Sequence, residues 1–472
     1  MTAEPAELLS ILRIHNQQHV LRWWNDLNEA QRSLLTTQIE DVDFETVRRV
    51  WSESSSQVAA DDNQAAWRAD RATAPSSVVR QPVSDSDRAA WQDAVSAGER
   101  LLADGSVAVI TVAGGQGSRL GFEHPKGMFP IGPVSDRTLF QIFAEQIRAR
   151  RRRHGGSIPW LIMTSAATHE ETIAFFGQHN FFGLPADSVA FFMQGDMPAV
   201  DAATGRLLLK DKASLALSPD GHGGIVGALK KSGLLDRLAR DEVDYVFYHQ
   251  VDNPTVIICD PALIGLHHQH KSQMTTNVVR KTSPTERMGV LVDLDGRTEI
   301  IEYSELTDEQ ANRTDGAGQW VFWAGNTAIH IFAREFFEQL TDGRLSLPLH
   351  LALKKVPYLD DSGVVVEPEK PNANKFERFI FDALPLAEYR LIVEGDRARE
   401  FNPVKNADGS DSPATAKAAL NRIGREWLAA AGYHVADDTN VEISPLVALD
   451  AAELASRLAS GKVRLEDLTD GK

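Results

Sequence analysis

The sequence has little cysteine and no long hydrophobic run. Its 472 residues include one cysteine, Cys259. A single thiol cannot form a disulfide within the chain, which fits a reducing compartment. No apolar run approaches the ~20 residues that a membrane-spanning helix needs. The N-terminus also lacks the basic flank and apolar stretch of a signal peptide. We therefore expect a cytoplasmic protein that has no membrane partner.

The chain also has fewer basic than acidic residues. The chain carries 49 Lys and Arg against 66 Asp and Glu, which gives a formal net charge of −17. Such a field repels nucleic acid and anionic membrane surfaces, so we predict neither as a partner. A local basic pocket for a phosphorylated ligand stays compatible with it, because close charges outweigh screened distant ones. The length predicts two or three domains.

Several catalytic and metal-binding patterns are missing. There is no G-x-S-x-G motif, and the histidine-rich stretch 267–270 lacks the spacing of a helical metal pair. We expect that stretch to be exposed. The arginine-rich stretch 148–154 is interpreted as the solvated C-terminal end of a helix, where cations are favoured. The sequence shows no internal repeat.

The order of segments predicts an α/β protein. Residues 5–50 have helical apolar spacing, and residues 52–82 are polar and read as a linker or surface segment. From 107 to about 385, strand-like and helix-like segments alternate, which favours a mainly parallel sheet. Asp295-Gly296 between two alternating runs predicts a β-hairpin beside that sheet. We therefore predict a helical region at 1–51, a linker and lead-in helix at 52–96, an α/β domain at 97–385 and a smaller C-terminal domain at 386–472.

A glycine-rich loop follows the first strand of the α/β region. TVAGGQGSRLGFEHPKG, residues 111–127, matches neither common phosphate-binding loop: Leu120 stands where a dinucleotide fingerprint has its third glycine, and Pro125 precedes Lys126 where a P-loop has glycine. Glycine N–H groups can surround an anion or pair with a base. Arg119 and Lys126 would add the charge that a triphosphate needs. The alternative is a tight turn with incidental charges.

Other polar residues follow apolar runs. Asp252 ends a strand, where its carboxylate suits Mg²⁺, or it is a turn or helix-cap residue. The Gln194 amide can accept from N3–H and donate to O4 of uracil. Asn326 can bind a hydroxyl or an N-acetyl group, or cap the next helix. Lys405 lies in a polar loop and is otherwise a surface lysine. His222, in a second glycine-rich loop, does not make a metal site alone.

Together these motifs resemble the UDP-sugar pyrophosphorylase family, and most closely its eukaryotic-type UDP-N-acetylhexosamine pyrophosphorylases. The glycine loop resembles the signature L-x-G-G-x-G-T-R-L-G-x-x-x-P-K-G, with Ser118 in place of threonine. The likeness continues in order through FFMQGDMPA, SPDGHGG, VDN, KTSPTERMGV and NPVKNADG. It implies a Rossmann-like, glycosyltransferase-A-like nucleotidyltransferase domain. It also implies transfer of uridylyl from UTP to a sugar-1-phosphate with Mg²⁺ or Mn²⁺.

The resemblance further implies a role for each matching residue. Arg119, Lys126 and Lys405 would hold the reacting phosphates, and Asp252 would ligate the metal ion. The nucleotide would be bound by Gly114, Gly115, Gln194, Gly221 and His222, and the sugar by Glu302, Asn326, Phe379 and Phe381.

One position departs from the closest subgroup. N-acetylhexosamine enzymes usually read D-G-N-G-G where this chain reads DGHGG, and UDP-glucose pyrophosphorylases read G-H-G-D. We therefore expect N-acetylglucosamine-1-phosphate as the acceptor and keep UDP-glucose or broad UDP-sugar pyrophosphorylase as the alternative. A second alternative is a regulatory protein that binds nucleotide sugars without turnover.

Overall fold

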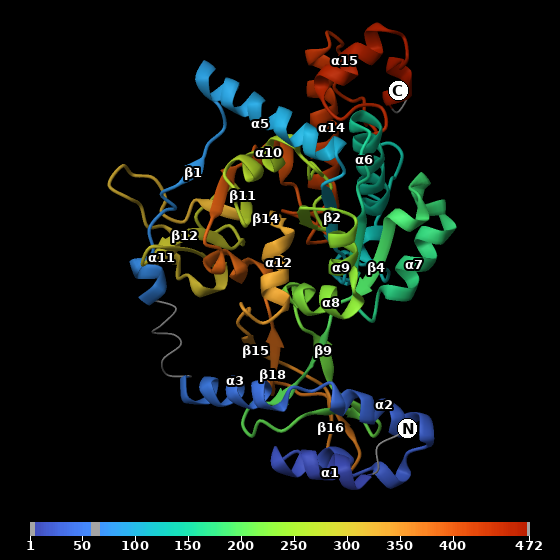
Figure 1. The fold of residues 1–472 in the computed structure, drawn as a ribbon, viewed down its shortest axis with the longest axis vertical. Coiled ribbons are helices and arrows are strands. Elements are labelled where there is room, and N and C mark those ends of the chain that lie inside the picture. The colour runs from blue at the N-terminus through green and yellow to red at the C-terminus, as the bar shows by residue number, and fades with distance from the viewer. Residues whose placement is uncertain (1–4, 58–66, 470–472) are drawn as a thin grey trace. The chain divides into compact units, whose positions relative to one another are not determined.

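The computed structural model describes residues 5–57 and 67–469 (Figure 1). The chain divides into two compact units, each built from several stretches of sequence. Unit 1 comprises Met1–Arg68, Gln194–Gly227 and Ser346–Asp382, and unit 2 comprises Ala69–Met193, Ala228–Leu345 and Ala383–Lys472. The four consecutive regions expected from the sequence stay a prediction, because compactness does not show which segments fold alone.

Unit 2 is built around one large sheet with the strand order β1-β19-β11-β14-β10-β2-β3-β4. Neighbours β10, β2, β3 and β4 are parallel, as are β11, β19 and β1, whereas β14 is antiparallel to both β10 and β11. The predicted mainly parallel sheet is confirmed, with one antiparallel strand inside it. The strands are β1 (Val78–Val79), β2 (Val107–Val112), β3 (Trp160–Thr164), β4 (Val189–Met193), β10 (Tyr245–Gln250), β11 (Met274–Arg280), β14 (Ala324–Ala333) and β19 (Arg390–Glu394).

The predicted hairpin is also confirmed. Strands β12 (Val290–Leu294) and β13 (Arg297–Ile301) pair antiparallel around Asp295 and Gly296. Both turn residues have positive φ, 50° and 80°. A two-residue hairpin turn of this hand needs that conformation, which explains the Asp-Gly pair. Strand β12 joins the sheet through β14.

Helices cover the sheet of unit 2. Ser84 and Asp87 form a capping box at the start of α5 (Asp85–Ala103), which confirms the predicted helix. In Figure 1, α5 crosses α10 (Pro261–Gln269), and a Cβ on Gly265 would lie 1.8 Å from the Ala94 carbonyl oxygen. Other helices of this unit are α6 (Leu139–His154), α7 (His169–Gln178), α9 (Leu234–Arg240), α11 (Asp308–Ala311), α12 (Arg334–Thr341), α13 (Arg397–Glu400), α14 (Pro413–Ala430) and α15 (Ala451–Ala459).

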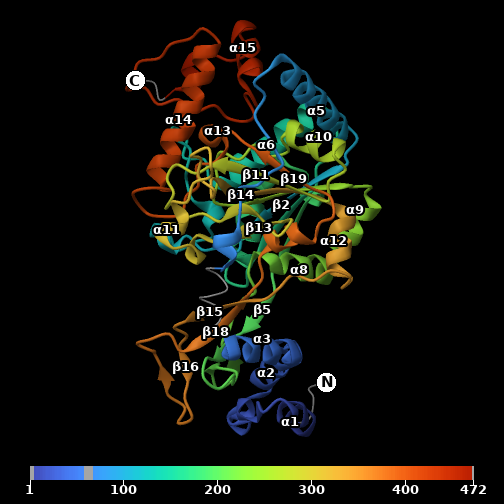
Figure 2. The same cartoon turned by 90° about the vertical axis from the view of Figure 1, so that its left-hand side faces the viewer.

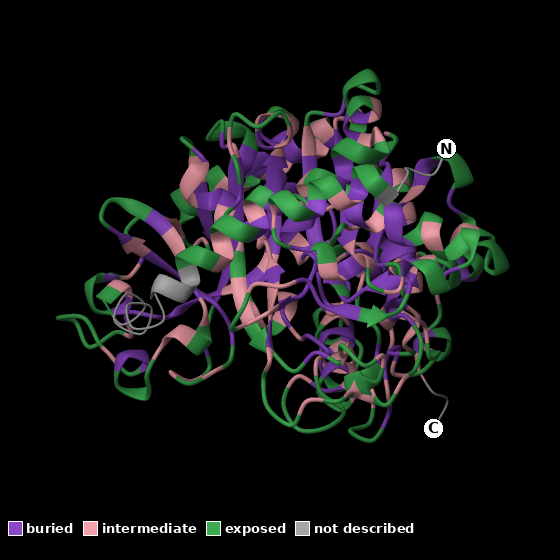
Figure 3. Cartoon of the chain, turned by 90° about the horizontal axis from the view of Figure 1, so that it is seen from below, coloured by how far each residue is buried: buried purple, intermediate pink, exposed green. Residues whose placement is uncertain are grey.

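The main core of unit 2 lies between the sheet and its helices. Figure 3 shows buried ribbon in the strands and exposed ribbon on the outer turns of the helices. Large aromatic side chains dominate the cluster, including Phe140, Phe143, Trp160, Phe176 and Phe247. Helices α14 and α15 lie side by side (Figure 2) and enclose a smaller cluster.

Two surface predictions were wrong in part: α6 does end in the arginine-rich stretch and residues 268–270 are exposed, but Arg150 and His267 are buried. Arg150 near the end of α6 is only 4% exposed, and its Nε donates to the Ile258 carbonyl at 3.2 Å. Arg153 forms ion pairs with Asp450 and Glu453. His267 is fully buried, with Nδ1 2.8 Å from the Thr275 hydroxyl. Each of these side chains is covered by segments distant in sequence, which a local pattern does not reveal.

The predicted linker is partly structural. Helix α3 (Phe44–Gln57) continues past residue 51, and residues 58–66 lie outside the described residues. Beyond them, Ala69 and Ala72 are buried in a cluster with β12 and β13. Strand β1 then pairs with β19. Residues 69–79 thus belong to the unit 2 fold.

Unit 1 combines the N-terminal helices with small sheets. Helices α1 (Pro5–Ile14), α2 (Glu29–Glu40) and α3 enclose a core that includes Leu8, Leu12, Trp24 and Phe376. Strands β15 (His350–Lys354), β18 (Ala373–Glu377) and β6 (Val200–Asp201) form a three-stranded sheet. Further strands are β5 (Asp196–Pro198), β7 (Leu209–Asp211), β8 (Ser214–Leu215), β9 (Leu217–Pro219), β16 (Tyr358–Leu359) and β17 (Val365–Val366), and α8 (Ile225–Ser232) begins at the end of its middle stretch.

The buried His267 makes folding stability depend on pH. Burial lowers the pKa of His267 from 6.5 to about 3, so the unfolded chain takes up a proton there that the folded chain does not. The free energy of unfolding should therefore fall as the pH falls below 6.5. We expect the stability advantage of the wild type over His267→Gln to shrink by about 3 kcal/mol between pH 7 and pH 4.

Denaturant titration at each pH measures this difference. His268→Gln, on the exposed side of the same helix, is the matched control. A difference between wild type and His267→Gln that does not change with pH would contradict the prediction.

Candidate active site

The glycine loop after β2 is held by its own backbone. The Gly117 N–H donates to the His124 carbonyl at 2.9 Å, and the Lys126 N–H donates to the Gly115 carbonyl at 3.1 Å. The Gly114 carbonyl accepts from the Ser165 hydroxyl at 2.7 Å. No described residue accepts from the N–H groups of Gly114 and Gly115, and a Cβ on Gly115 would meet nothing within 4 Å. The loop therefore leaves two N–H groups without an acceptor among the described residues, as base or anion binding requires.

The two cationic side chains of the loop, Lys126 and Arg119, differ in burial. Lys126 is half-buried, and its Nζ lies 3.4 Å from the Val404 carbonyl. Arg119 lies in a short 3-10 turn, Ser118–Leu120, and is exposed. Among the described residues, no carboxylate forms an ion pair with either side chain. Both charges are thus available to a phosphorylated ligand.

Asp252 follows the C-terminal end of β10, which is the sheet edge where ligands bind in α/β folds. Its side chain is half-buried and forms no hydrogen bond or ion pair with the described residues. Its carbonyl oxygen accepts from the Val404 N–H at 2.8 Å. Asp252 lies in a turn, as the alternative interpretation allows, but it caps no described helix, and its carboxylate stays free to bind a ligand.

The backbone of Lys405 lies close to Lys126 and Asp252. It follows Val404, which contacts Lys126 through its carbonyl and Asp252 through its N–H. The structure therefore brings Lys126, Asp252 and Lys405 together around one residue. They come from positions about 280 residues apart in the chain.

Asn253 joins the two segments that carry Asp252 and Lys405. It is 3% exposed, and its Nδ2 donates to the Glu400 carbonyl at 2.7 Å. Its Oδ1 accepts from the Asn402 N–H at 3.1 Å and from the Thr255 hydroxyl at 3.0 Å. The Asn402 amide completes the frame with a 3.0 Å hydrogen bond to the Thr255 hydroxyl. This role was not predicted, since the sequence does not reveal the distant partners of an asparagine beside a candidate ligand.

A second feature that the sequence did not predict lies beneath the glycine loop. The Trp160 Nε1–H donates to the Thr111 hydroxyl at 2.8 Å, and that hydroxyl lies 2.8 Å from His249 Nε2. His249 Nδ1 lies 3.1 Å from the Gln250 carbonyl. These contacts fix a neutral tautomer with the proton on Nδ1. Burial accordingly lowers the pKa of His249 to about 4. The network ties together β3, β2 and β10, the last two of which lead to Gly114 and Asp252.

Asn326 and Glu302 lie beside the hairpin of unit 2. Asn326 lies within β14, so the helix-cap alternative is wrong. Its Oδ1 accepts from the Ala328 N–H at 3.0 Å, and its Nδ2 donates to no described residue. Glu302 precedes a short 3-10 helix, Tyr303–Glu305, and its Oε1 lies 2.8 Å from the position of a Cβ on Gly289. The Asn326 N–H donates to the Gly289 carbonyl at 2.8 Å. The Glu302 side chain and the Asn326 backbone therefore both lie next to Gly289.

The second glycine loop belongs to unit 1 and packs against the backbone of Arg378. Gly221 has φ of 82°, and a Cβ there would lie 2.5 Å from the Arg378 carbonyl oxygen. The Gly223 N–H donates to the same carbonyl at 2.8 Å. Glycine is thus required at 221 for its backbone conformation and for close approach.

His222 sits in an aromatic cluster of unit 1. Its ring centroid lies 5.4 Å from those of Phe379 and Phe381, which stack on each other. Its Nδ1 accepts from the Ile380 N–H at 3.1 Å, so the ring proton is on Nε2. Burial lowers the pKa of His222 to about 4, which keeps the ring neutral at physiological pH. His222 therefore presents one neutral N–H donor. Gln194, directly after β4, makes no hydrogen bond with a described residue through its amide.

The described residues contain no cluster of side chains that could bind a metal ion without further ligands. Residues 5–57 and 67–469 hold no group of three His, Cys, Asp or Glu that could bind a metal ion. The single free carboxylate of Asp252 nevertheless suits Mg²⁺, which proteins often bind through one or two carboxylates together with substrate phosphates. None of the helices in these residues combines the length and apolar composition of a transmembrane helix.

Known proteins resemble this chain over most of its length. The family model described as UTP–glucose-1-phosphate uridylyltransferase matches residues 50–455. A UDP-N-acetylhexosamine pyrophosphorylase-like protein 1 from Xenopus tropicalis is 36% identical over 443 residues, 90% of this chain and 85% of the relative. The UDP-N-acetylglucosamine pyrophosphorylase of Saccharomyces cerevisiae is 38% identical, covering 74% of this chain and 75% of the relative.

A solved structure resembles the fold as well. The uridine diphosphate N-acetylglucosamine pyrophosphorylase from Trypanosoma brucei aligns with a TM-score of 0.83 and 27% identity, covering 98% of this chain and 96% of that structure. With the family match and these relatives, the chain belongs to the UDP-sugar pyrophosphorylases, a family of nucleotidyltransferases.

Proposed function

We propose that the chain is a uridylyltransferase that converts UTP and N-acetylglucosamine-1-phosphate to UDP-N-acetylglucosamine and pyrophosphate. The relatives described above are named for this sugar nucleotide or its N-acetylhexosamine class. The observation that carries the proposal is the convergence of Lys126, Asp252 and Lys405 around Val404. The enzyme would work in the cytoplasm, where the buried thiol of Cys259 stays reduced.

The reaction needs no protein base. An oxygen of the sugar phosphate, already anionic at neutral pH, forms a bond to the α-phosphorus of UTP, while the bond from that phosphorus to the bridging oxygen breaks and pyrophosphate leaves in line. The barrier is the approach of two polyanions, so catalysis consists of positioning and charge neutralisation. Arg119, Lys126 and Lys405 supply positive charge for this purpose. Mg²⁺ or Mn²⁺ at Asp252 would neutralise charge on the nucleotide phosphates.

The remaining site residues would bind the base and the sugar. The free N–H groups of Gly114 and Gly115 suit the uridine, and the unpaired Gln194 amide suits the uracil edge. Gly221 would let the nucleotide approach the second loop closely. The free Nδ2 of Asn326 and the carboxylate of Glu302 suit the sugar, with Phe379 and Phe381 as apolar walls.

The first test is a substrate panel. We expect pyrophosphate release from UTP to be fastest with N-acetylglucosamine-1-phosphate among the 1-phosphates of N-acetylglucosamine, N-acetylgalactosamine, glucose and galactose. A preference for glucose-1-phosphate would support the alternative sugar. Glucose-1-phosphate is in the panel because His222 resembles the histidine of UDP-glucose pyrophosphorylases. Release with none of the four would refute the enzymatic proposal and leave the nucleotide-sugar-binding protein.

The second test concerns Asp252. Asp252→Asn removes the charge that would hold the cation, so turnover should fall by at least ~100-fold. Asp244→Asn is the matched control, because it lies exposed just before the same strand at its opposite end. Steady-state kinetics with varied Mg²⁺ measure the effect. Near-full activity of Asp252→Asn would remove Asp252 from the mechanism.

The third test concerns the choice of sugar. His222 has one N–H donor at a fixed position. Asparagine has a smaller amide side chain and is the usual residue at this position in N-acetylhexosamine enzymes. His222→Asn should raise the ratio of kcat/KM for N-acetylglucosamine-1-phosphate over glucose-1-phosphate by about 10-fold. His350→Asn, on the same aromatic cluster through Phe379, is the control. An unchanged ratio would show that His222 does not select the sugar.

A further inference from the structure

Strand β14 contains a β-bulge directly after Asn326. The pairing of β14 with β11 shifts its register at Asn277, so residues 327–329 lie opposite that one residue. Ala328 in the bulge has a φ of 57°, in the left-handed region that residues with a side chain rarely adopt. Its N–H donates to Asn326 Oδ1 at 3.0 Å, which leaves Nδ2 as the free donor of that amide. Bulges are common beside active sites, where they redirect a side chain, and this one orients the amide proposed to bind the sugar.

A buried hydroxyl holds the bulge. Thr327 is 4% exposed, and its hydroxyl donates to the Asn277 carbonyl at 2.8 Å and lies 3.1 Å from Asn277 Oδ1. The Ile329 N–H donates to the same hydroxyl at 3.3 Å. Asn277 is itself 3% exposed. Without the Thr327 hydroxyl, polar atoms would be left unpaired in the interior, so this side chain stabilises one conformation of the bulge.

Asn277 also contacts α13. Its Nδ2 donates to Glu400 Oε2 at 3.1 Å, while Glu400 Oε1 accepts from the Asp396 N–H at 2.7 Å. A Cβ on Gly395 would lie 2.6 Å from both Asn277 Nδ2 and Glu400 Oε2, so the two side chains meet over a position that only glycine can fill. The Glu400 carboxylate thus binds a donor from each of two segments.

Glu400 connects these contacts to the frame around Asn253. Its backbone carbonyl accepts from Asn253 Nδ2 at 2.7 Å, while its side chain bonds Asn277. A continuous path of hydrogen bonds therefore leads from the bulge of β14 through Asn277 and Glu400 to Asn253. All of these residues belong to unit 2. Asn253 in turn fixes the backbone of Asp252 and of the segment that carries Lys405.

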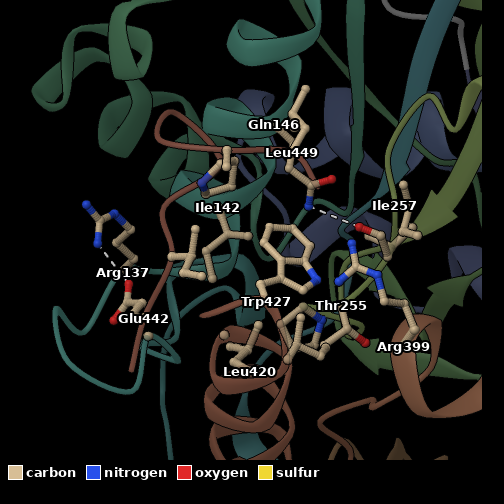
Figure 4. Close-up of a pocket in the computed structure, with 18 of the residues that line it drawn as sticks. Arg137, Ile142, Gln146, Thr255, Ile257, Arg399, Leu420, Trp427, Glu442 and Leu449 are labelled. Carbon is tan, nitrogen blue, oxygen red and sulfur yellow. Dashed lines mark hydrogen bonds and ion pairs between the residues drawn. The ribbon is translucent and has the colours of Figure 1, made fainter. Parts of the chain in front are cut away.

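A cavity borders α13 at Arg399. Its volume is about 100 Å³, and Figure 4 shows Trp427 at the centre of its wall, with Arg399 and Thr255 among the residues that line it. Side chains beside a cavity lose contacts on that face, so packing there does little to fix α13. The hydrogen bonds of Glu400 therefore contribute more to the position of this helix.

From these contacts we infer that Thr327, Asn277 and Glu400 are positioning residues for the reaction, an inference that rests on the proposed function. The acceptor carries its attacking oxygen on a phosphate that is joined to the sugar. In-line attack therefore requires the sugar, held at Asn326, and the phosphate, held by the frame around Asn253, to keep a fixed relation to each other. The buried network supplies that relation, and its side chains act on the two sites rather than on the substrate.

Thr327→Val tests the sugar end of the network, because valine keeps the shape and removes the hydroxyl. Burial raises the pKa of Glu400 to about 7, so the kinetics are measured at pH 8, where the carboxylate is mostly ionised. We expect the KM for N-acetylglucosamine-1-phosphate to rise at least ~10-fold while the KM for UTP stays within about 2-fold of the wild type. Thr327→Ser, which restores the hydroxyl, should return both values to near the wild type.

The matched control is Thr275→Val on β11. Thr275 is fully buried, and its hydroxyl lies 2.8 Å from His267 Nδ1, so the same loss of a hydroxyl occurs outside the network. This control should lower the melting temperature without changing either KM. A sugar KM that is unchanged in Thr327→Val, or that rises equally in the control, would overturn the inference.

Glu400→Gln tests the other end of the network at constant size. A carboxylate accepts from both the Asp396 N–H and Asn277 Nδ2, whereas a glutamine amide has one oxygen and turns its NH₂ group towards one of the two donors. We expect kcat/KM for the sugar phosphate to fall at least ~10-fold, and the double variant with Thr327→Val to lose far less than the product of the two single losses. Glu388→Gln, an exposed glutamate just before β19, should behave like the wild type. Single losses that multiply in full would show that the two ends act independently and would overturn the network.

Ligand binding separates this inference from the proposed function. Calorimetric titration with UDP-N-acetylglucosamine should show at least ~10-fold weaker binding to Thr327→Val than to the wild type, without any turnover. An active wild type whose kinetics neither Thr327→Val nor Glu400→Gln alters would overturn the positioning role alone. A wild type that binds this ligand but releases no pyrophosphate would overturn the proposed catalysis, while the titration still tests the network. A wild type that neither binds nor reacts would overturn both.

Discussion

The candidate site depends on the hydrogen bonds of Asn253. This buried side chain joins the end of the 245–250 strand to the segment that runs from Glu400 to Lys405. Both of its polar atoms are paired, and removal of either partner would leave a buried amide unsatisfied at a cost of about 1–3 kcal/mol. The frame fixes the backbone of Asp252 and of the Lys405 segment, and Lys126 reaches the same point through Val404.

Such a frame suits a reaction whose difficulty is electrostatic. Catalysis by preorganised charge requires that cations hold their positions before the substrate arrives. The glycine loop is fixed by its internal backbone bonds, and the strands beneath it are joined by the buried Trp160, Thr111 and His249 network. In unit 1, His222 is held by the Ile380 N–H in one tautomer, so it too presents a preset donor. The chain thus builds its candidate site from small, fully paired polar networks and leaves free the groups that would meet the ligand.

The parts of the fold that could be predicted are those encoded locally. The capped helix 85–103, the hairpin at Asp295-Gly296 and the strand that leads into the glycine loop each depend on residues close in sequence, and the structure contains all three. The position of Asp252 just after the strand 245–250 also follows from the local apolar pattern. What failed depends on packing between distant segments: Arg150 lies in a stretch typical of a solvated helix end, but it is buried and its Nε bonds the Ile258 carbonyl.

The same limit applies to the site. Asn253 and His249 were not singled out, because their importance lies in partners more than a hundred residues away. The cavity beside Trp427 is lined by six separate segments, 132–137, 142–150, 254–257, Arg399, 420–427 and 442–449, none of which carries a motif. Asn326 illustrates the opposite case, since its location inside a strand excluded the cap that local reasoning allowed, while its role as a ligand group stays a prediction.

We expect Asn253 to serve the reaction by holding the Lys405 segment and Asp252 in one place. A double-mutant cycle measures this most directly, with kcat/KM for UTP determined for Asn253→Ala, Lys405→Met and the double variant. If the frame acts through Lys405, the double variant should lose far less than the product of the two single losses. Losses that multiply in full would show that Asn253 and Lys405 act independently and would contradict the account.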